Sequence, residues 1–472
     1  MSPRKIFLFA LIAVLAGCSL KPSYERPSLP TATVYPDETV TAKQAAVRVA
    51  QVGWREFFTD ARLQEVIRQA LENNRDLRLA MHRIQEARAF YGIQRADQLP
   101  GISAGAFYSR SRTPAGLSLT GSAYASEQYQ VSLSVSVWEL DFWGRVRSLT
   151  EAALESYLGT EEARRAVAIS LVTQVANTYL IARELDEQVA IARQALATRE
   201  DSYRITRRRY EVGSSSKLDA AQAETLLNQA RADLASLLRL KDQNRNALVL
   251  LVGVPDLTSE ARTLSQIEPG FAREISVGLP SDLLVNRPDI LAAEHRLKAA
   301  NADIGAARAA FFPNISLTGL FGTASNELSG LFGSGSGIWS FQPSLIMPIF
   351  EAGRLRANLD LAEARRNLAV ADYERTIQGA FREVADALAE RRWLLEQVSA
   401  QRATLAAQTE RARLAALRYQ NGAAPYLEVL DAERDRFVAE QALVQVRRAL
   451  LSSSVNLYSA LGGGIPRSVQ QP

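Results

Sequence analysis

The sequence predicts a membrane protein of mixed helices and strands, built from two copies of one unit. Two observations point to this fold class: very long helical stretches, and short segments with alternating polarity. No proline occurs between Val146 and Val254, and apolar residues recur there at intervals of three and four. In YQVSLSVSV, which starts at Tyr129, every second residue is apolar, as in a membrane strand with one lipid face and one wet face.

The duplication is visible in matched motifs about 210 residues apart. Two long copies indicate a duplicated unit, because a solenoid would show many units of about 20 to 50 residues. The pairs are Asn74-Arg75-Asp76-Leu77 with Asn286-Arg287-Pro288-Asp289-Ile290, Gly144-Arg145-Val146-Arg147 with Gly353-Arg354-Leu355-Arg356, Arg209-Tyr210 and Gly213 with Arg418-Tyr419 and Gly422, and Leu250-Leu251-Val252-Gly253 with Ser459-Ala460-Leu461-Gly462.

The N-terminus predicts export and a lipid anchor. Arg4 and Lys5 precede an apolar run that is too short to span a bilayer, and Leu15-Ala16-Gly17-Cys18 follows it. The four-residue motif resembles the lipobox of bacterial lipoproteins, in which the cysteine is lipidated and becomes residue one. The alternative is an ordinary signal peptide with an incidental cysteine. We predict lipidation of Cys18, and Ser19 after it indicates sorting to the Gram-negative outer membrane.

The composition excludes several classes of function. Cys18 is the only cysteine, so neither an intrachain disulfide nor a thiolate metal site is expected. The 55 basic and 51 acidic residues are scattered along the chain, which argues against nucleic-acid binding. The glycine-rich segment from Gly333 to Gly337 lacks the Lys-Ser/Thr of a phosphate loop, and no zinc spacing or catalytic constellation occurs. We therefore expect no enzyme, no metal and no cofactor.

The predicted strands form two pairs, one in each copy. The strands over 129–137 and 339–347 are expected to place Tyr129, Val131, Leu133, Val135, Val137 and Trp339, Phe341, Leu345, Met347 on one face. Two further strands are expected over 102–111 and 315–323. Four strands cannot close a barrel, and open sheet edges are not tolerated in lipid, so several chains would share one barrel. The alternative is a soluble sheet with one buried face.

The expected organisation follows from these elements. We predict a signal peptide over 1–17 and a lipidated N-terminal, equatorial segment over 18–60. The first repeat covers 61–254, with strands in about 101–142 and long helices over about 146–212 and 217–253. An equatorial linker occupies 255–285. The second repeat covers 286–462, with strands in about 314–350 and helices over about 354–421 and 425–461, and 463–472 is a tail.

Several further motifs carry a family resemblance that extends over essentially the whole mature chain. They are Trp54 with Phe57-Phe58, Ala70-Leu71-Glu72-Asn73-Asn74-Arg75-Asp76-Leu77, Leu279-Pro280-Ser281-Asp282-Leu283-Leu284, Arg287-Pro288-Asp289-Ile290, Gly305-Ala306-Ala307-Arg308-Ala309-Ala310-Phe311-Phe312-Pro313 and Asn456-Leu457-Tyr458-Ser459-Ala460-Leu461-Gly462. With the lipobox, they resemble the outer-membrane factor family, the TolC-like and OprM-like lipoprotein channels of drug efflux.

The resemblance implies a homotrimer with one twelve-stranded transmembrane β-barrel, a long periplasmic α-helical barrel and a mixed equatorial domain. It implies passive export of drugs and small toxic compounds through a tripartite system. The expected partners are a periplasmic membrane-fusion adaptor, an inner-membrane RND-type pump and outer-membrane lipid. Two alternatives remain: an exit duct for type I protein secretion, and a lipid-anchored coiled-coil scaffold without a pore.

The repeated Arg-Tyr-x-x-Gly turns correspond, by the resemblance, to the periplasmic tip where the tube closes. Gly213 and Gly422 can adopt positive φ after a helix end, and Pro425 suits the start of a returning helix. These three are the expected turn and adaptor-docking residues. The implied gate consists of Leu427, Glu428, Asp431, Asp219 and Tyr419.

Glu428 and Asp431 are three residues apart and therefore share a helix face. The alternative for these two acids and for Asp219 is that they are first-turn residues favoured by the helix dipole. One position departs from the family pattern: Ala424 occupies the place of a basic residue. A basic partner for the tip is therefore either missing or supplied from elsewhere.

Overall fold

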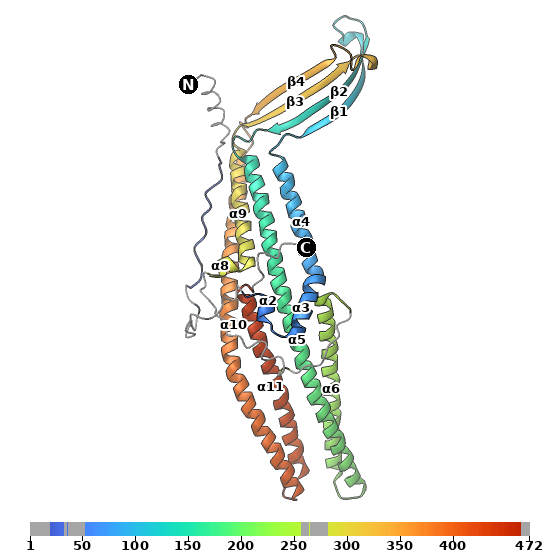
Figure 1. Ribbon diagram of the computed structural model, residues 1–472, viewed down its shortest axis with the longest axis vertical. Coiled ribbons are helices and arrows are strands. Elements are labelled where there is room, and N and C mark those ends of the chain that lie inside the picture. Colours follow the sequence, from blue (N-terminus) through green and yellow to red (C-terminus); the bar gives the residue numbers. More distant parts are fainter. Residues whose placement is uncertain (1–18, 33–34, 36–51, 256–263, 265–281, 464–472) are drawn as a thin grey trace. The chain divides into compact units, whose positions relative to one another are not determined.

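The computed structural model describes residues 19–32, 35, 52–255, 264 and 282–463 (Figure 1). These residues form two compact units, and each unit takes segments from both repeats. Unit 1 consists of Met1–Ser28, Arg83–Glu161 and Ala292–Glu374, and unit 2 of Leu29–His82, Glu162–Leu291 and Arg375–Pro472. The signal peptide, Cys18, most of the 255–285 linker and residues 464–472 lie outside the described residues.

Helices make up most of the described chain. The four long helices are α5 (Arg145–Glu211), α6 (Lys217–Val252), α10 (Arg354–Gln420) and α11 (Tyr426–Ala460). The shorter ones are α2 (Trp54–Phe57), α3 (Ala61–Asn73), α4 (Arg75–Ala96), α8 (Leu283–Asn286) and α9 (Pro288–Ala309). None of the helices in the described ranges is long and apolar enough to cross a bilayer.

Unit 1 contains a four-stranded antiparallel sheet in the order β1-β2-β3-β4 (Figure 1). The strands are β1 (Ile102–Thr113), β2 (Tyr124–Glu139), β3 (Asn314–Ser325) and β4 (Gly337–Ile346). Single 3-10 turns, Ala115–Leu117 and Leu328–Gly330, lie in the connections within each pair. Within the described residues β1 and β4 each pair with one strand only, so the sheet has two open edges.

The two faces of the sheet differ in polarity, as the alternation predicts. The strand registers align one apolar row across all four strands: Ala104 with Leu133, Leu133 with Phe321, and Phe321 with Trp339. The neighbouring row on the other face is Ser103, Ser134, Leu320 and Ser340. The apolar row is exposed in the single chain, with Phe321 at 72% and Trp339 at 76%. Such a patch requires a partner other than water.

One detail of the alternation was predicted incorrectly. Val135 pairs with Gly319 and Trp138 with Leu317, so two residues of β2 lie opposite one residue of β3. This β-bulge shifts the alternation by one residue. Trp138, and not Val137, therefore continues the apolar face beyond Val135.

The repeat is also evident in unit 2, where a short helix meets the end of a long one. Asn74 donates from Nδ2 to the carbonyl of Leu251 at 2.9 Å, and Arg287 donates from Nη1 to the carbonyl of Ala460 at 2.9 Å. The two acceptors are repeat equivalents. Gly253 and Gly462 lie two residues after these acceptors, with φ angles of +77° and +94°. A Cβ added to either glycine would lie very close to the backbone of the residue that precedes Asn74 or Arg287.

Candidate functional site

The two tip turns in unit 2 have the same backbone structure. In the first, the amides of Gly213 and Ser214 donate to the carbonyls of Tyr210 and Arg209 at 2.9 and 2.8 Å. In the second, Gly422 and Ala423 donate to Tyr419 and Arg418 at 3.0 and 2.9 Å. Both pairs are the 5→2 and 6→1 bonds of a Schellman motif, which satisfies carbonyls at a helix end.

A glycine is required in each turn because of its conformation. Gly213 has φ +80° and Gly422 has φ +70°, and both would leave an added Cβ in open space. The left-handed conformation costs a residue with a side chain about 1–2 kcal/mol. The predicted turn positions are therefore the places where the backbone reverses.

The helices that follow the two turns begin differently. In the first repeat, Ser216 is the N-cap of α6 and forms a capping box with Asp219, with both reciprocal bonds at 3.1 Å. The hydroxyl of Ser215 donates to the same carboxylate at 3.0 Å. Hydrogen bonds from Ser216 and Ser215 hold the pKa of Asp219 below its usual value. In the second repeat, Pro425 is the N-cap of α11 and makes no side-chain cap bond.

The predicted gate acids of the second repeat have basic partners in the same chain. Arg418 donates from Nη1 to Oε1 of Glu428 at 2.5 Å, and Arg434 lies 3.2 Å from a carboxylate oxygen of Asp431. The side chains of Glu428 and Asp431 are 34% and 42% exposed. Arg418, in the last turn of α10, is therefore the basic partner of Glu428.

Tyr419 connects the two tip turns. Arg209 of the first turn donates from Nη1 to the hydroxyl of Tyr419, and the ring of Tyr419 contacts that of Tyr426 at 4.8 Å between centroids. The hydroxyl of Tyr426 shares a hydrogen bond with Ser202 on α5. Helix α5 is thereby joined to both helices of the second-repeat hairpin, α10 and α11.

Further contacts between α5 and α11 in unit 2 are also polar. Arg448 donates to Glu184 at 2.6 Å, and Gln441 donates to the carbonyl of Gln188 at 3.2 Å. Arg199 is only 8% exposed and donates to the carbonyl of Leu430 at 3.4 Å. Burial lowers its pKa, but an arginine remains charged at neutral pH. Groups of this kind can exchange protein partners for water if the helices separate.

The contact between α10 and α11 combines an apolar cluster with ion pairs, among them Arg411 with Asp435 at 2.6 Å. Ala412 and Ala415 of α10 pack with Ala432 of α11 in a buried cluster, and Val429 covers it. Small side chains let the two helices approach closely. The second hairpin is thus held together by apolar packing and ion pairs, and polar contacts also link it to α5.

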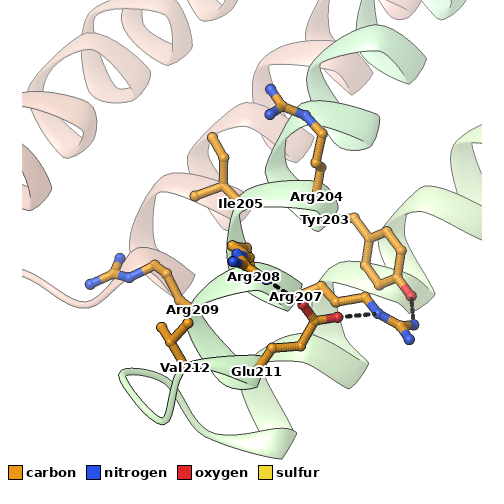
Figure 2. A pocket seen from close by; sticks show the side chains of 8 residues that line it. All are labelled: Tyr203, Arg204, Ile205, Arg207, Arg208, Arg209, Glu211 and Val212. Atoms are coloured by element: carbon orange, nitrogen blue, oxygen red, sulfur yellow. Dashed lines mark hydrogen bonds and ion pairs between the residues drawn. The ribbon is translucent and has the colours of Figure 1, made fainter.

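An open, basic hollow lies beside the end of α5 (Figure 2). It encloses about 650 Å³ and is lined by Tyr203, Arg204, Ile205, Arg207, Arg208, Arg209, Glu211 and Val212. Figure 2 shows Arg207 between Tyr203 and Glu211, with bonds of 2.8 and 3.3 Å. The exposed Ile205 and Val212 add apolar surface beside Gly213.

The structure brings together Tyr419, Glu428, Gly422, Pro425 and the first turn. Leu427 is 44% exposed, and Asp219 contacts serines of its own turn. Sequence reasoning missed Arg209 and Arg418 as partners of Tyr419 and Glu428, although both occur in the repeated Arg-Tyr motif. In the described part of the chain, no group of histidine, cysteine and acidic residues could hold a metal ion.

The chain is similar to known proteins along nearly its whole length. The family model described as "Outer membrane efflux protein" matches residues 66–254 and 279–463. The toluene efflux pump outer membrane protein TtgC of Pseudomonas putida is 47% identical over 98% of this chain and 96% of the relative. The outer membrane protein OprJ of Pseudomonas aeruginosa is 47% identical over 96% and 95%.

The chain is also similar to a solved structure. The open state of the Neisseria gonorrhoeae MtrE outer membrane channel is 40% identical, covers 96% of this chain and 100% of that chain, and has a TM-score of 0.86. The fold class expected from the sequence, a mixed helix-and-strand membrane protein, is therefore confirmed.

Proposed function

This chain belongs to the outer membrane efflux protein family, and on that premise we propose that it is the exit duct of a tripartite efflux system. Drugs and small toxic compounds, including apolar solvents, leave through it passively while an inner-membrane RND-type pump supplies the energy. The toluene efflux role named for TtgC, at 47% identity, supports small molecules as the cargo.

The observation that carries the channel is the sheet of unit 1. It has one apolar face, one mostly polar face and two open edges. Unpaired edge groups cost several kcal/mol each in lipid, so β4 of one copy would pair with β1 of the next. Three copies then close a twelve-stranded barrel with the apolar face toward lipid and the polar face toward a water-filled passage.

The proposed gate lies at the tip turns. Leu427, Glu428, Asp431 and Tyr419 would narrow the passage. Asp219 would contribute by holding the first turn through its capping box. The contacts that support a closed arrangement are the Arg418–Glu428 ion pair and the bond from Arg209 to Tyr419. Opening would require the second hairpin to leave α5, and the polar character of that contact makes separation feasible.

The proposed partners follow from the same geometry. Gly213, Gly422 and Pro425 are exposed at the turns and would dock a periplasmic membrane-fusion adaptor, together with the basic hollow beside them. A lipid on Cys18 would anchor the chain in the Gram-negative outer membrane, with the helices in the periplasm.

Two measurements test the proposal. A strain that lacks its own outer membrane efflux protein should regain tolerance to toluene when it expresses this chain with a compatible pump and adaptor. The purified trimer should also conduct ions in planar bilayers when the tip is opened by substitution. A trimer that never conducts, even with an opened tip, would rule out the channel and leave the scaffold.

A further inference from the structure

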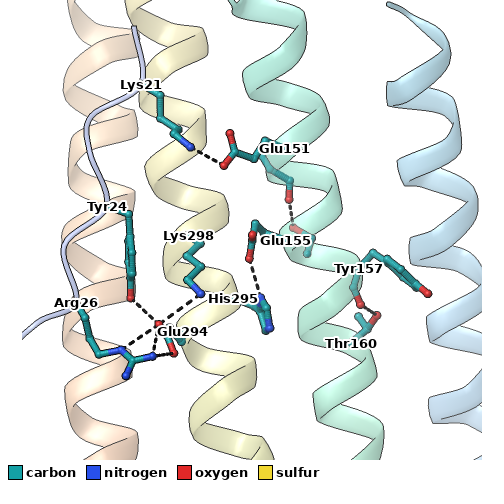
Figure 3. Close-up of polar contacts among 12 residues, drawn as sticks. Lys21, Tyr24, Arg26, Glu151, Glu155, Tyr157, Thr160, Glu294, His295 and Lys298 are labelled. Carbon is teal, nitrogen blue, oxygen red and sulfur yellow. Dashed lines mark hydrogen bonds and ion pairs between the residues drawn. The ribbon is translucent and has the colours of Figure 1, made fainter. Parts of the chain in front are cut away.

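The start of the described chain lies as an extended strap against two helices of unit 1 (Figure 3). We call residues 19–28 the N-terminal strap. Its main attachment is Glu294 of α9, whose side chain is 4% exposed. Arg26 donates from Nη2 to both carboxylate oxygens at 2.9 and 3.0 Å, and the hydroxyl of Tyr24 donates at 3.1 Å. The strap thus forms a bidentate ion pair with a buried carboxylate.

The strap follows one face of α9 step by step. Lys298 lies 5.4 Å from the Tyr24 ring, and Asn301 donates from Nδ2 to the carbonyl of Pro22 at 2.9 Å. Glu294, Lys298, Asn301 and Gly305 are spaced by four, three and four residues, so they share a helix face. From 294 to 305 the helix rises about 16 Å, and the five extended steps from residue 21 to residue 26 also span about 16 Å. The strap and this face match in length.

The end of the strap at Lys21, its upper end, is held as closely as the end at Arg26. Lys21 forms an ion pair with Glu151 of α5 at 2.5 Å. A Cβ on Gly305 would lie 3.0 Å from the Cα of Lys21 and 2.7 Å from Oγ of Ser148. Position 305 therefore has no room for a side chain while the strap is in place. Lys21 is held against both α5 and α9.

This upper end lies close to the joint between the sheet and the helices. Glu151 is six residues after Arg145, where α5 begins, a rise of about 9 Å. At the joint, Trp143 stacks on Phe312 at 4.8 Å and donates from Nε1 to the carbonyl of Pro313 at 2.8 Å. Tryptophan is enriched at the boundary between lipid and water. The exposed Leu99 and Ile349 also flank the strands here.

We propose that the N-terminal strap sets the depth at which the sheet sits in the outer membrane. It does so by holding the lipid-bearing end of the chain at the joint between sheet and helices. The partner is the inner-leaflet lipid surface, and Glu294 is the positioning residue. The inference rests on the proposed lipidation of Cys18. Three residues of chain span at most about 11 Å, so acyl chains on Cys18 start no farther than that from Lys21.

The test measures membrane depth in proteoliposomes with the full lipidated trimer. A spin label is attached to Ile349→Cys, and its exposure to oxygen and to a water-soluble nickel complex is compared. Cys18 carries lipid or is replaced, so the introduced cysteine reacts alone. The variants are Cys18→Ala, Glu294→Gln, Arg26→Ala and a six-residue Gly-Ser insertion between Ser19 and Leu20. The insertion leaves both the lipid and the strap contacts intact and only lengthens the chain between them.

All four variants are expected to shift the label's depth in the same direction. Glu294→Gln combined with Cys18→Ala should shift it no further than Cys18→Ala alone, because both changes interrupt one connection. Glu155→Gln, which alters the contact of α5 with His295 of α9 and not a contact of the strap, is the matched control and should leave the depth unchanged. Arg26→Ala removes the other partner of the same ion pair and therefore tests the contact even if Glu294→Gln misfolds.

Three results would overturn the proposal. One is an unchanged depth after the Gly-Ser insertion. Another is lower thermal stability of Glu294→Gln and Arg26→Ala with no change of depth, which would make the strap purely structural. The third is absence of lipid on Cys18 by mass spectrometry. Single-channel conductance measured on the same samples reports the channel independently, so failure of the strap and failure of the proposed function are distinguishable.

Discussion

The first and second tip turns share a backbone motif but carry different side-chain chemistry. Both use a glycine at positive φ and the same pair of amide bonds. After the first turn, Asp219 serves its own helix through the capping box with Ser216. After the second turn, Glu428 accepts a hydrogen bond from Arg418, and Pro425, the N-cap of α11, makes no side-chain cap bond. Duplication preserved the reversal of the chain, while the acids acquired separate roles.

The ends of the two hairpins away from the tip turns also differ in their side-chain contacts. Asn74 and Arg287 donate to equivalent carbonyls, at Leu251 and Ala460. Arg287 in addition pairs with Asp289 and Glu383 at 2.6 and 2.8 Å, contacts that a neutral Asn74 cannot form. In both places the second repeat forms an ion pair at a contact where the first repeat uses a neutral partner. This comparison predicts that substitutions at equivalent positions have unequal effects.

The largest difference is expected at the tyrosines of the turns. Tyr419→Phe removes the hydroxyl that accepts from Arg209, so the link between the hairpins weakens and single-channel conductance should rise several-fold. A hydrogen bond to a charged group contributes about 1.5–3 kcal/mol, and partial exposure reduces this. Tyr210→Phe in the first turn is the matched control. An equal rise in both variants would refute the assigned asymmetry.

The turn glycines should respond alike, because their role is conformational. Gly213→Ala and Gly422→Ala each place a side chain at positive φ, at a cost of about 1–2 kcal/mol. Hydrogen exchange of the last-turn amides of α5 and α10 should increase by similar factors. A tenfold difference between the two hairpins would show that the turns are not equivalent in backbone.

The helix caps should differ by a smaller amount. Ser216→Ala removes the capping box and is expected to destabilise the start of α6 by about 1 kcal/mol. Pro425→Ser supplies a cap that α11 lacks and should protect its first-turn amides. Hydrogen exchange measures both effects. If Pro425→Ser increases exchange in α11, the rigid proline matters more there than a cap.

The smallest effect is a loosening of the first turn in acid. The pKa of Asp219 is lowered in the folded chain by hydrogen bonds from Ser216 and Ser215. Its contribution is therefore complete above the unfolded pKa, near 3.8, and is lost as the pH falls through the folded value. Protection of the Ser216 and Asp219 amides should drop in that range. The Asp219→Asn variant should lack this pH dependence.

The sequence predicts much of this fold because its signals are local. Apolar spacing gives the helices, alternation gives the strands, and Gly213 and Gly422 give the turns. The bulge before Trp138 lies within a regular alternation and leaves no local signal. The pairing of Arg209 with Tyr419 joins residues 210 positions apart, and the grip of Arg26 on Glu294 joins residues 268 apart. Only the folded chain brings such groups together.

The most direct test of a second-turn gate compares single-channel conductance in planar bilayers for matched acid substitutions. We expect Glu428→Ala with Asp431→Ala to raise conductance and to weaken block by divalent cations, because the substitutions remove the carboxylates that narrow the mouth and bind the cations. Asp219→Ala should change conductance less. Unchanged conductance and block in the double variant, or an equal effect of Asp219→Ala, would contradict a gate centred on the second turn.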